Sequence, residues 1–212
     1  IQHHYLFNAK EIENNNNNNP EWYIKKNDDP FLEMIKLYDK ILEDYLQIKD
    51  IDLIVATGLS QKLYDRVKYY YRLKNHDNFL NKVGIKFKEI QKLMTRDFVI
   101  YFDNEIEKEN AKEILKNIYS MNGDNIFGEI DSRNETLFVS LTYPDEIDKD
   151  FKIEYKGKKY NFYNDVDFVA IKNGMHSHKG YAYFTEDIEK YEPKNLSHIK
   201  ELHNSIENYF LS

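Results

Sequence analysis

Two short apolar runs constrain the fold of this chain more than any other feature. The runs are "IDLIVA" (51–56) and "DFVAI" (167–171), and neither alternates regularly between apolar and polar residues. Strands that are apolar on both faces are typical of parallel sheets covered by helices, because an antiparallel strand with one solvated face alternates. The runs therefore predict an α/β fold: a mostly parallel sheet flanked by helices.

Helices are predicted on either side of these strands. Asp29 can cap a helix that has Pro30 in its first turn and continues to Leu46. A second helix is expected from about 196 to 211 at the end of the sequence. Residues 14–19 are six asparagines, a polar run that we interpret as a solvated loop. The apolar positions of the first helix recur at helical spacing: Phe31, Ile35, Tyr38, Ile41, Leu42 and Tyr45.

The middle of the chain has strands that are expected to pair with near neighbours. A helix from about 105 to 120 can be capped by Asp103 or Asn104. Two hairpins follow, one joining 126–130 to 136–143 and one joining 151–155 to 160–163. We therefore predict a smaller α+β subdomain at 63–164, inserted into an α/β layer that consists of 1–62 and 165–212.

Composition excludes several classes of function. The formal net charge of −7 argues against general nucleic-acid binding, which needs a basic surface. The stretch "KYYYRLK" (68–74) interleaves aromatic and basic residues, but alternation in a half-buried strand explains it equally well. No segment has the roughly 20 apolar residues that a membrane helix needs, so we expect a soluble protein. The absence of cysteine excludes disulfides and cysteine-ligated zinc.

Histidines are the residues with the clearest potential for chemistry. His176 and His178 lie in "KNGMHSHKGY", and in extended chain residues i and i+2 point to the same side. They could therefore face one metal ion, since neutral imidazole binds zinc and similar metals. Ordinary polar loop residues are the alternative. His3 and His4 form a weaker candidate pair, because adjacent residues of an extended chain face opposite sides.

The stretch "ATGLSQ" (56–61) is a candidate for substrate binding. It follows a predicted buried strand, where open α/β sheets collect ligand-binding groups. Thr57, Ser60 and Gln61 supply hydroxyl and amide groups there. An ordinary turn is the alternative. The remaining histidines, His76, His198 and His203, are interpreted as structural.

Three stretches resemble the later part of the alkaline phosphatase superfamily, on its phosphodiesterase and nucleotide pyrophosphatase side. They are "QHHYLF" near the start, "YDKILEDYLQIKDIDLIVATG", and "FVAIKNGMHSHKGYAYF". The likeness covers about 1–62 and 165–212. It implies an alkaline phosphatase-like sheet, a divalent metal that is most simply zinc, and a small-molecule phosphate or sulfate ester as substrate. It also implies that His176 is a metal ligand, with His178 accessory and one of His3 or His4 converging on it.

Two departures from the family pattern qualify this resemblance. The family has Ser-Asp-His-Gly after the central strand, where the aspartate and histidine bind a second metal. Here Thr57, Gly58, Leu59 and Ser60 stand in that place and supply neither ligand. The nucleophile of the family has no visible counterpart, and we expect it upstream of Ile1. The chain therefore resembles a C-terminal fragment, or a relative with an altered site.

Three hypotheses follow for the function. The first is a metal-dependent hydrolase of phosphate, phosphodiester or sulfate esters; the family uses paired metals, but without the aspartate–histidine pair we expect at most one metal here. The second is a relative without catalysis that binds a glycan or a nucleotide, or acts as an interaction module. The third is a purely structural role. The sequence leaves the oligomeric state and the compartment open.

Overall fold

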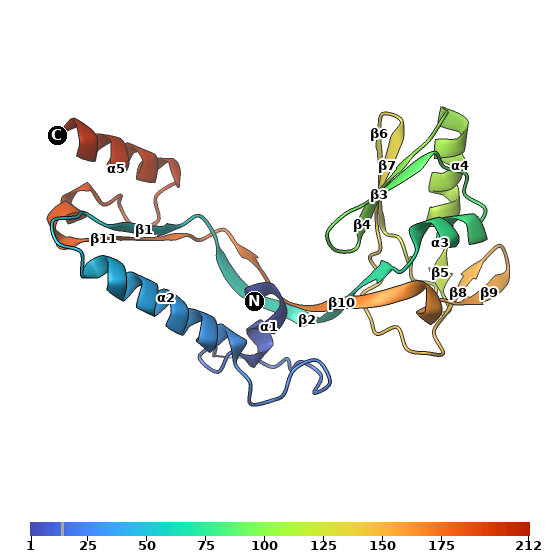
Figure 1. Ribbon diagram of the computed structural model, residues 1–212, viewed down its shortest axis with the longest axis horizontal. Helices are drawn as coiled ribbons and strands as arrows, with labels where there is room; N and C mark the ends of the chain where they lie inside the picture. Colours follow the sequence, from blue (N-terminus) through green and yellow to red (C-terminus); the bar gives the residue numbers. More distant parts are fainter. Residues whose placement is uncertain (14) are drawn as a thin grey trace. The chain divides into compact units, whose positions relative to one another are not determined.

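The computed structural model describes residues 1–13 and 15–212, which form two compact units (Figure 1). Unit 1 consists of the described residues of 1–66 together with 173–212, and unit 2 consists of 67–172. The sequence suggested an insert at 63–164. The chain passes between the units along β2 (Ser60–Leu73) and β10 (Val166–Ser177), two strands that are hydrogen bonded to each other.

The predicted mostly parallel sheet is wrong. The described residues form small sheets of two, two, four and three strands, and each described strand register is antiparallel. In unit 1, β1 (Ile54–Thr57) pairs with β11 (Tyr181–Phe184), so that Ile54 lies opposite Phe184. The fold is mixed, with helices beside small antiparallel sheets.

The misinterpretation of "IDLIVA" has a physical cause. An unbroken apolar run shows that a segment avoids water, but it does not show what covers the segment. In the structure Ile54 and Val55 are only half-buried, and Ala56 and Thr57 are exposed. The run therefore belongs to a short strand whose sheet has only one other strand, β11, and such a small sheet does not bury both faces of the run.

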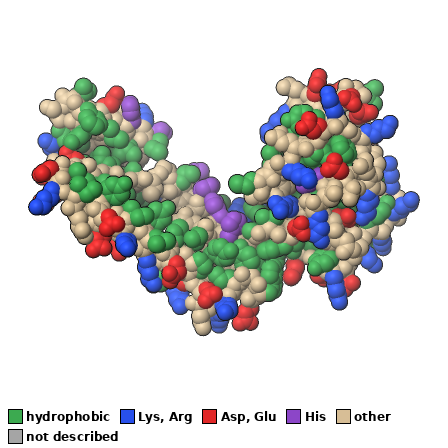
Figure 2. Space-filling model, viewed as in Figure 1, with side chains coloured by type: hydrophobic (Ala, Val, Ile, Leu, Met, Phe, Trp, Pro, Cys, Tyr) green, Lys and Arg blue, Asp and Glu red, His purple; other side chains and the backbone are tan. Residues whose placement is uncertain are grey.

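Unit 1 contains the predicted first helix, now α2 (Pro30–Leu46). Asp29 caps it as expected, with its Oδ1 accepting a hydrogen bond from the backbone N–H of Leu32 at 2.9 Å. No residue of α2 is buried, and Figure 2 shows apolar side chains on the surface of unit 1. The other elements of this unit are α1 (Gln2–Tyr5), η1 (Leu6–Asn8), η3 (Glu186–Tyr191) and α5 (Lys200–Leu211).

Unit 2 is built on a four-stranded antiparallel sheet in the order β3-β4-β7-β6. Both predicted hairpins are confirmed, the first between β6 and β7 and the second between β8 and β9. The second hairpin extends to a three-stranded sheet in the order β5-β8-β9. The strands are β3 (Glu89–Lys92), β4 (Asp97–Tyr101), β5 (Tyr119–Ser120), β6 (Glu129–Arg133), β7 (Thr136–Ser140), β8 (Lys152–Tyr155) and β9 (Lys158–Asn161).

The large hydrophobic core of the chain lies in unit 2. Helices α3 (His76–Lys82) and α4 (Glu105–Lys116) contribute Phe79 and Leu115 to it, and β4 and β7 contribute Ile100 and Leu137. Asn104 caps α4 as predicted, with its side chain accepting from the N–H of Glu107 at 2.9 Å. A short helix η2 (Tyr163–Asp165) precedes β10. Among the described residues, no helix is both long enough and apolar enough to span a membrane.

The asparagine run is a loop whose alternate members are half-buried rather than fully solvated. Asn14 lies outside the described residues; Asn15, Asn17 and Asn19 are half-buried, and the two between them are exposed. The half-buried asparagine side chains form hydrogen bonds with other segments of unit 1. For example, Nδ2 of Asn15 donates to the Phe7 carbonyl at 2.6 Å. A polar run thus forms a connection between backbone segments of unit 1, because an amide side chain can both donate and accept.

Candidate functional site

The candidate site lies in unit 1, where α1 packs on the end of β10. Gly174 makes this approach possible, since a Cβ at that position would lie 2.6 Å from the carbonyl oxygen of Gln2. Such a distance is far below van der Waals contact, so any side chain at 174 would push the helix away. The close approach places His3, the next residue of α1, beside the strand that carries His176.

His3 is held by the backbone of the glycine. Its Nδ1 lies 3.2 Å from the carbonyl oxygen of Gly174. A carbonyl can only accept a hydrogen bond, so this contact favours the form of His3 in which Nδ1 carries the proton. The other ring nitrogen, Nε2, then holds the free lone pair that a metal or a proton can take.

His176 is held by Gln61, near the start of β2. Nε2 of Gln61 lies 2.9 Å from Nδ1 of His176, and the other end of the amide, Oε1, is buried without a hydrogen-bond partner among the described residues. The two ends of a glutamine amide are nearly equal in size, and a half-turn exchanges them. In the exchanged form Oε1 accepts the Nδ1 proton of His176, and the NH₂ group takes the buried position that Oε1 has now.

The two imidazoles meet directly. The ring centroids of His3 and His176 are 4.8 Å apart, and the rings are inclined at 81°, edge to face. With the Gln61 amide in the exchanged form, both Nδ1 atoms donate to the protein and each ring has Nε2 as its free nitrogen. This is how metal-binding histidines are commonly oriented, with the second ring nitrogen fixed by a carbonyl or side chain. Figure 2 shows histidine side chains gathered on this face.

His4 is near this pair but is placed differently. Its ring centroid is 6.3 Å from that of His3. The prediction treated His3 and His4 as extended residues facing opposite sides, whereas in the structure both lie in the short helix α1. Successive helical residues are separated by about 100° around the axis, so only one of the two turns toward Gly174.

His178 lines a hollow that neither His3 nor His176 lines. Strand β10 ends at Ser177, so the extended geometry that would point His176 and His178 to the same side ends before His178. The hollow that His178 lines has a volume of about 490 Å³, and Thr57 and Lys179 also line it. The Oγ1 of Thr57 accepts from the backbone N–H of Tyr181 at 3.1 Å.

The predicted substrate residues are therefore divided. Gln61 contacts His176, Thr57 lines the second hollow, and Ser60 is half-buried at the start of β2. They follow a strand of an antiparallel pair and not the carboxyl end of a parallel strand. The fold-based reason for grouping them thus fails, although Gln61 lies beside a predicted metal ligand.

The donor set supplies two nitrogen ligands for a metal. No group of three or more His, Cys, Asp and Glu side chains that could hold an ion is found in residues 1–13 and 15–212. Catalytic zinc sites commonly use three protein ligands and leave a position for water. The imidazole pair therefore fits a metal as a two-histidine half-site, and its ligand role stays a prediction.

Asn173, which precedes the glycine, is a residue that the sequence did not single out. It is fully buried, and its Oδ1 accepts from the backbone N–H of Phe7 at 3.0 Å and from Nδ2 of Asn19 at 2.7 Å. A buried amide with several partners fixes the relative position of the segments that it joins. Asn173 thereby holds the chain next to α1 against β10, close to the histidine pair.

Comparisons with known proteins returned no match: no family model, no characterised protein and no solved structure is similar to this chain.

Proposed function

We propose that this chain binds a divalent metal ion through His3 and His176, and that it hydrolyses phosphate, phosphodiester or sulfate esters. The single observation that carries the proposal is the edge-to-face contact of these two rings, which come from distant parts of the chain. Both rings have Nδ1 beside a protein group, Gly174 O for His3 and the Gln61 amide for His176. The likeness of "GMHSHKG" to a metal-binding turn supports the part given to His176.

Each residue has a defined part in this proposal. His3 and His176 would hold the ion through Nε2, with Gly174 and Gln61 fixing the direction of the rings. A divalent ion at such a site supplies a Lewis acid for the ester oxygens. Gln61 is the neighbouring group that could also donate a hydrogen bond to an ester oxygen. His178 and Thr57 line the separate hollow and would act on a larger substrate only at a distance from the ion.

A second candidate function is a binding module without catalysis. The observation that favours it is the absence of a third His, Cys, Asp or Glu ligand in the described part of the chain. The sequence departure at Thr57, Gly58, Leu59 and Ser60 points the same way. In this case the ligand would be a glycan or a nucleotide. The histidine pair would then either have no function or form hydrogen bonds to that ligand.

The test begins with the metal content of the purified chain after incubation with zinc, manganese or calcium. We expect one ion per chain by elemental analysis, and loss of that ion in both His3→Ala and His176→Ala. His203→Ala is the matched control, because His203 is exposed and pairs with Glu207 on α5. Metal that persists in both variants, or that is absent from the native chain, overturns the metal site.

Catalysis is tested on the same metal-loaded samples. The substrates are bis(p-nitrophenyl) phosphate, p-nitrophenyl phosphate and p-nitrophenyl sulfate, which release a coloured phenolate. Turnover that disappears with the metal in His176→Ala supports the hydrolase. Bound metal without turnover of any of the three esters favours the non-catalytic module.

A further inference from the structure

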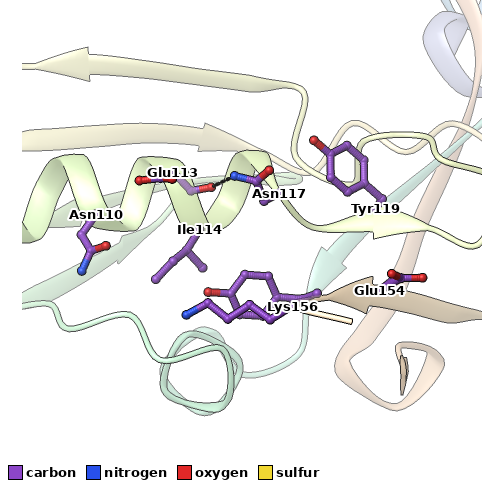
Figure 3. A pocket seen from close by; sticks show the side chains of 8 residues that line it. Asn110, Glu113, Ile114, Asn117, Tyr119, Glu154 and Lys156 are labelled. Carbon is purple, nitrogen blue, oxygen red and sulfur yellow. Dashed lines mark hydrogen bonds between the residues drawn. The ribbon is translucent and has the colours of Figure 1, made fainter. Parts of the chain in front are cut away.

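Unit 2 contains a hollow that the proposed hydrolase function does not use. It has a volume of about 530 Å³ and lies between α4 and the turn that joins β8 to β9 (Figure 3). This volume is within the range of small-molecule sites in proteins. The residues that line it are Asn110, Glu113, Ile114, Asn117, Tyr119, Glu154, Tyr155 and Lys156.

One wall of the hollow is a polar stripe on α4. Asn110, Glu113 and Asn117 are spaced by three and four residues, so they lie along one face of the helix. Figure 3 shows all three along the same stretch of α4, with Ile114 between them. The Nδ2 of Asn117 donates to the backbone carbonyl of Glu113 at 2.8 Å. This bond fixes the amide group, and the Oδ1 of Asn117 can then accept a hydrogen bond from a ligand.

The opposite wall is formed by the end of β8 and its turn. Lys156 and Gly157 have positive φ angles of 49° and 70°, as a tight two-residue hairpin turn requires. The turn folds the Lys156 side chain back, so that its ammonium group lies over the Tyr155 ring, 5.1 Å from the centroid. Tyr155 raises the pKa of Lys156, which therefore stays charged at neutral pH.

The hydroxyl group of Tyr155 is the unusual feature of this site. Tyr155 is only 5% exposed, and its hydroxyl is buried without a hydrogen bond of good geometry in the described residues; the Lys156 ammonium is the neighbour that interacts with it. Buried polar groups in native proteins are nearly always paired, so an unpaired one calls for an explanation. The flexible stem of Lys156 lies next to it, and this side chain can move aside without disturbing the core.

We propose that this hollow binds a neutral sugar and that the Tyr155 hydroxyl pairs with a hydroxyl group of that ligand. The lining offers acceptors in Glu113 and Glu154, a donor in Lys156, and amides that do both. Sugar hydroxyls each donate and accept, so they match this mixture. A simple anion would meet the two carboxylates, and a simple cation would meet the Lys156 ammonium, so a neutral polyol fits better than either.

The experiment uses the full chain and free monosaccharides. Glucose, galactose, mannose and N-acetylglucosamine are titrated while the backbone amide signals are followed by NMR. We expect at least one sugar to shift signals of α4 and of the β8–β9 turn. Tyr155→Phe should weaken that binding about tenfold, because it removes one hydrogen bond to the ligand. Glu113→Gln should weaken it as well, through loss of a charged acceptor.

Stability separates a binding role from a structural one. Since the Tyr155 hydroxyl makes no well-formed hydrogen bond in the described residues, and its neighbour Lys156 is exposed, Tyr155→Phe should leave the unfolding midpoint nearly unchanged or raise it. Tyr163→Phe is the matched control, because Tyr163 is in the same unit but is exposed and outside the hollow. The proposal is overturned if none of the four sugars shifts these signals, or if Tyr155→Phe binds the sugars as well as the native chain. None of these outcomes depends on the histidine pair.

Discussion

Asn173 and Asn19 exchange two amide hydrogen bonds in unit 1. Nδ2 of Asn19 donates to Oδ1 of Asn173 at 2.7 Å, and Nδ2 of Asn173 donates to Oδ1 of Asn19 at 2.8 Å. Asn173 also accepts from the Phe7 backbone. The asparagine run is thus joined to the strand that carries Gly174 and His176. Because a buried amide without partners is costly, this pair fixes the arrangement from which the candidate site is built.

Replacing Asn173 by Leu should destabilise unit 1 by about 2–4 kcal/mol, since it leaves the Phe7 N–H and the Asn19 amide without partners. The single tryptophan of the chain, Trp22, lies in unit 1, so its fluorescence during urea unfolding measures this unit. The control is Asn16→Ala, at an exposed member of the same run, for which a change within about 0.5 kcal/mol is expected. Equal effects of the two variants would contradict the structural role of Asn173.

Gly174→Ala should separate His3 from His176. The added Cβ would lie 2.6 Å from the Gln2 carbonyl, so α1 must move away from β10. We expect loss of the nuclear Overhauser contacts between the two rings and a drop in metal affinity, while unit 2 keeps its native spectrum. Gly58→Ala is the control, because its Cβ would meet only Ile199 Cδ1, at an ordinary contact distance of 3.6 Å. Retained ring contacts in Gly174→Ala would contradict the proposed role of the glycine.

Gln61→Leu should release the His176 ring. The variant removes the amide that lies 2.9 Å from Nδ1 of His176, so the preference for one tautomer should fall. The ring nitrogen chemical shifts of His176 measure this preference directly. Metal affinity should fall by about tenfold, the lower end of the effect of removing a group that orients a ligand. Gln91→Leu in unit 2 is the control and should change neither quantity; an unchanged His176 tautomer in Gln61→Leu would refute the orienting role.

The buried His76 should make unit 2 less stable in acid. Burial, together with the positive charges of Lys92 and Arg72, lowers the pKa of His76 to about 4, while Asp77 opposes the shift. In the unfolded chain the same group has a pKa near 6.5. Between these values the unfolded chain binds a proton that the folded chain does not, so stability falls as the pH drops below about 6.5 toward about 4.

Protonation of His76 should lower the free energy of unfolding of unit 2 by about 2 kcal/mol between a pH of about 7.5 and a pH of about 5. Hydrogen exchange of the β4 and β7 amides measures it, because these strands lie in unit 2. His76→Leu should remove this part of the pH dependence, whatever its effect on stability at neutral pH. His203→Gln, at an exposed histidine of unit 1, should leave it unchanged. A native pH dependence in His76→Leu would show that another group is responsible.

The sequence alone determined the local elements of this protein. Asp29 and Asn104 mark the starts of α2 and α4, and both hairpins of unit 2 were predicted, although β6 extends to Arg133, past the predicted strand at 126–130. Caps and tight turns depend on residues within a few positions of one another. For this reason they can be found without knowing the rest of the structure.

Only the tertiary structure decided how the strands pair and what lies beside His176. The apolar run at 51–56 is equally compatible with a buried parallel strand and with the half-exposed β1, and the pairing with β11 settled which one forms. His3 meets the Gly174 carbonyl across 171 positions of sequence. Such contacts depend on backbone approach, as at Gly174, and on buried amide pairs, as at Asn173, and neither leaves a periodic signal in the sequence.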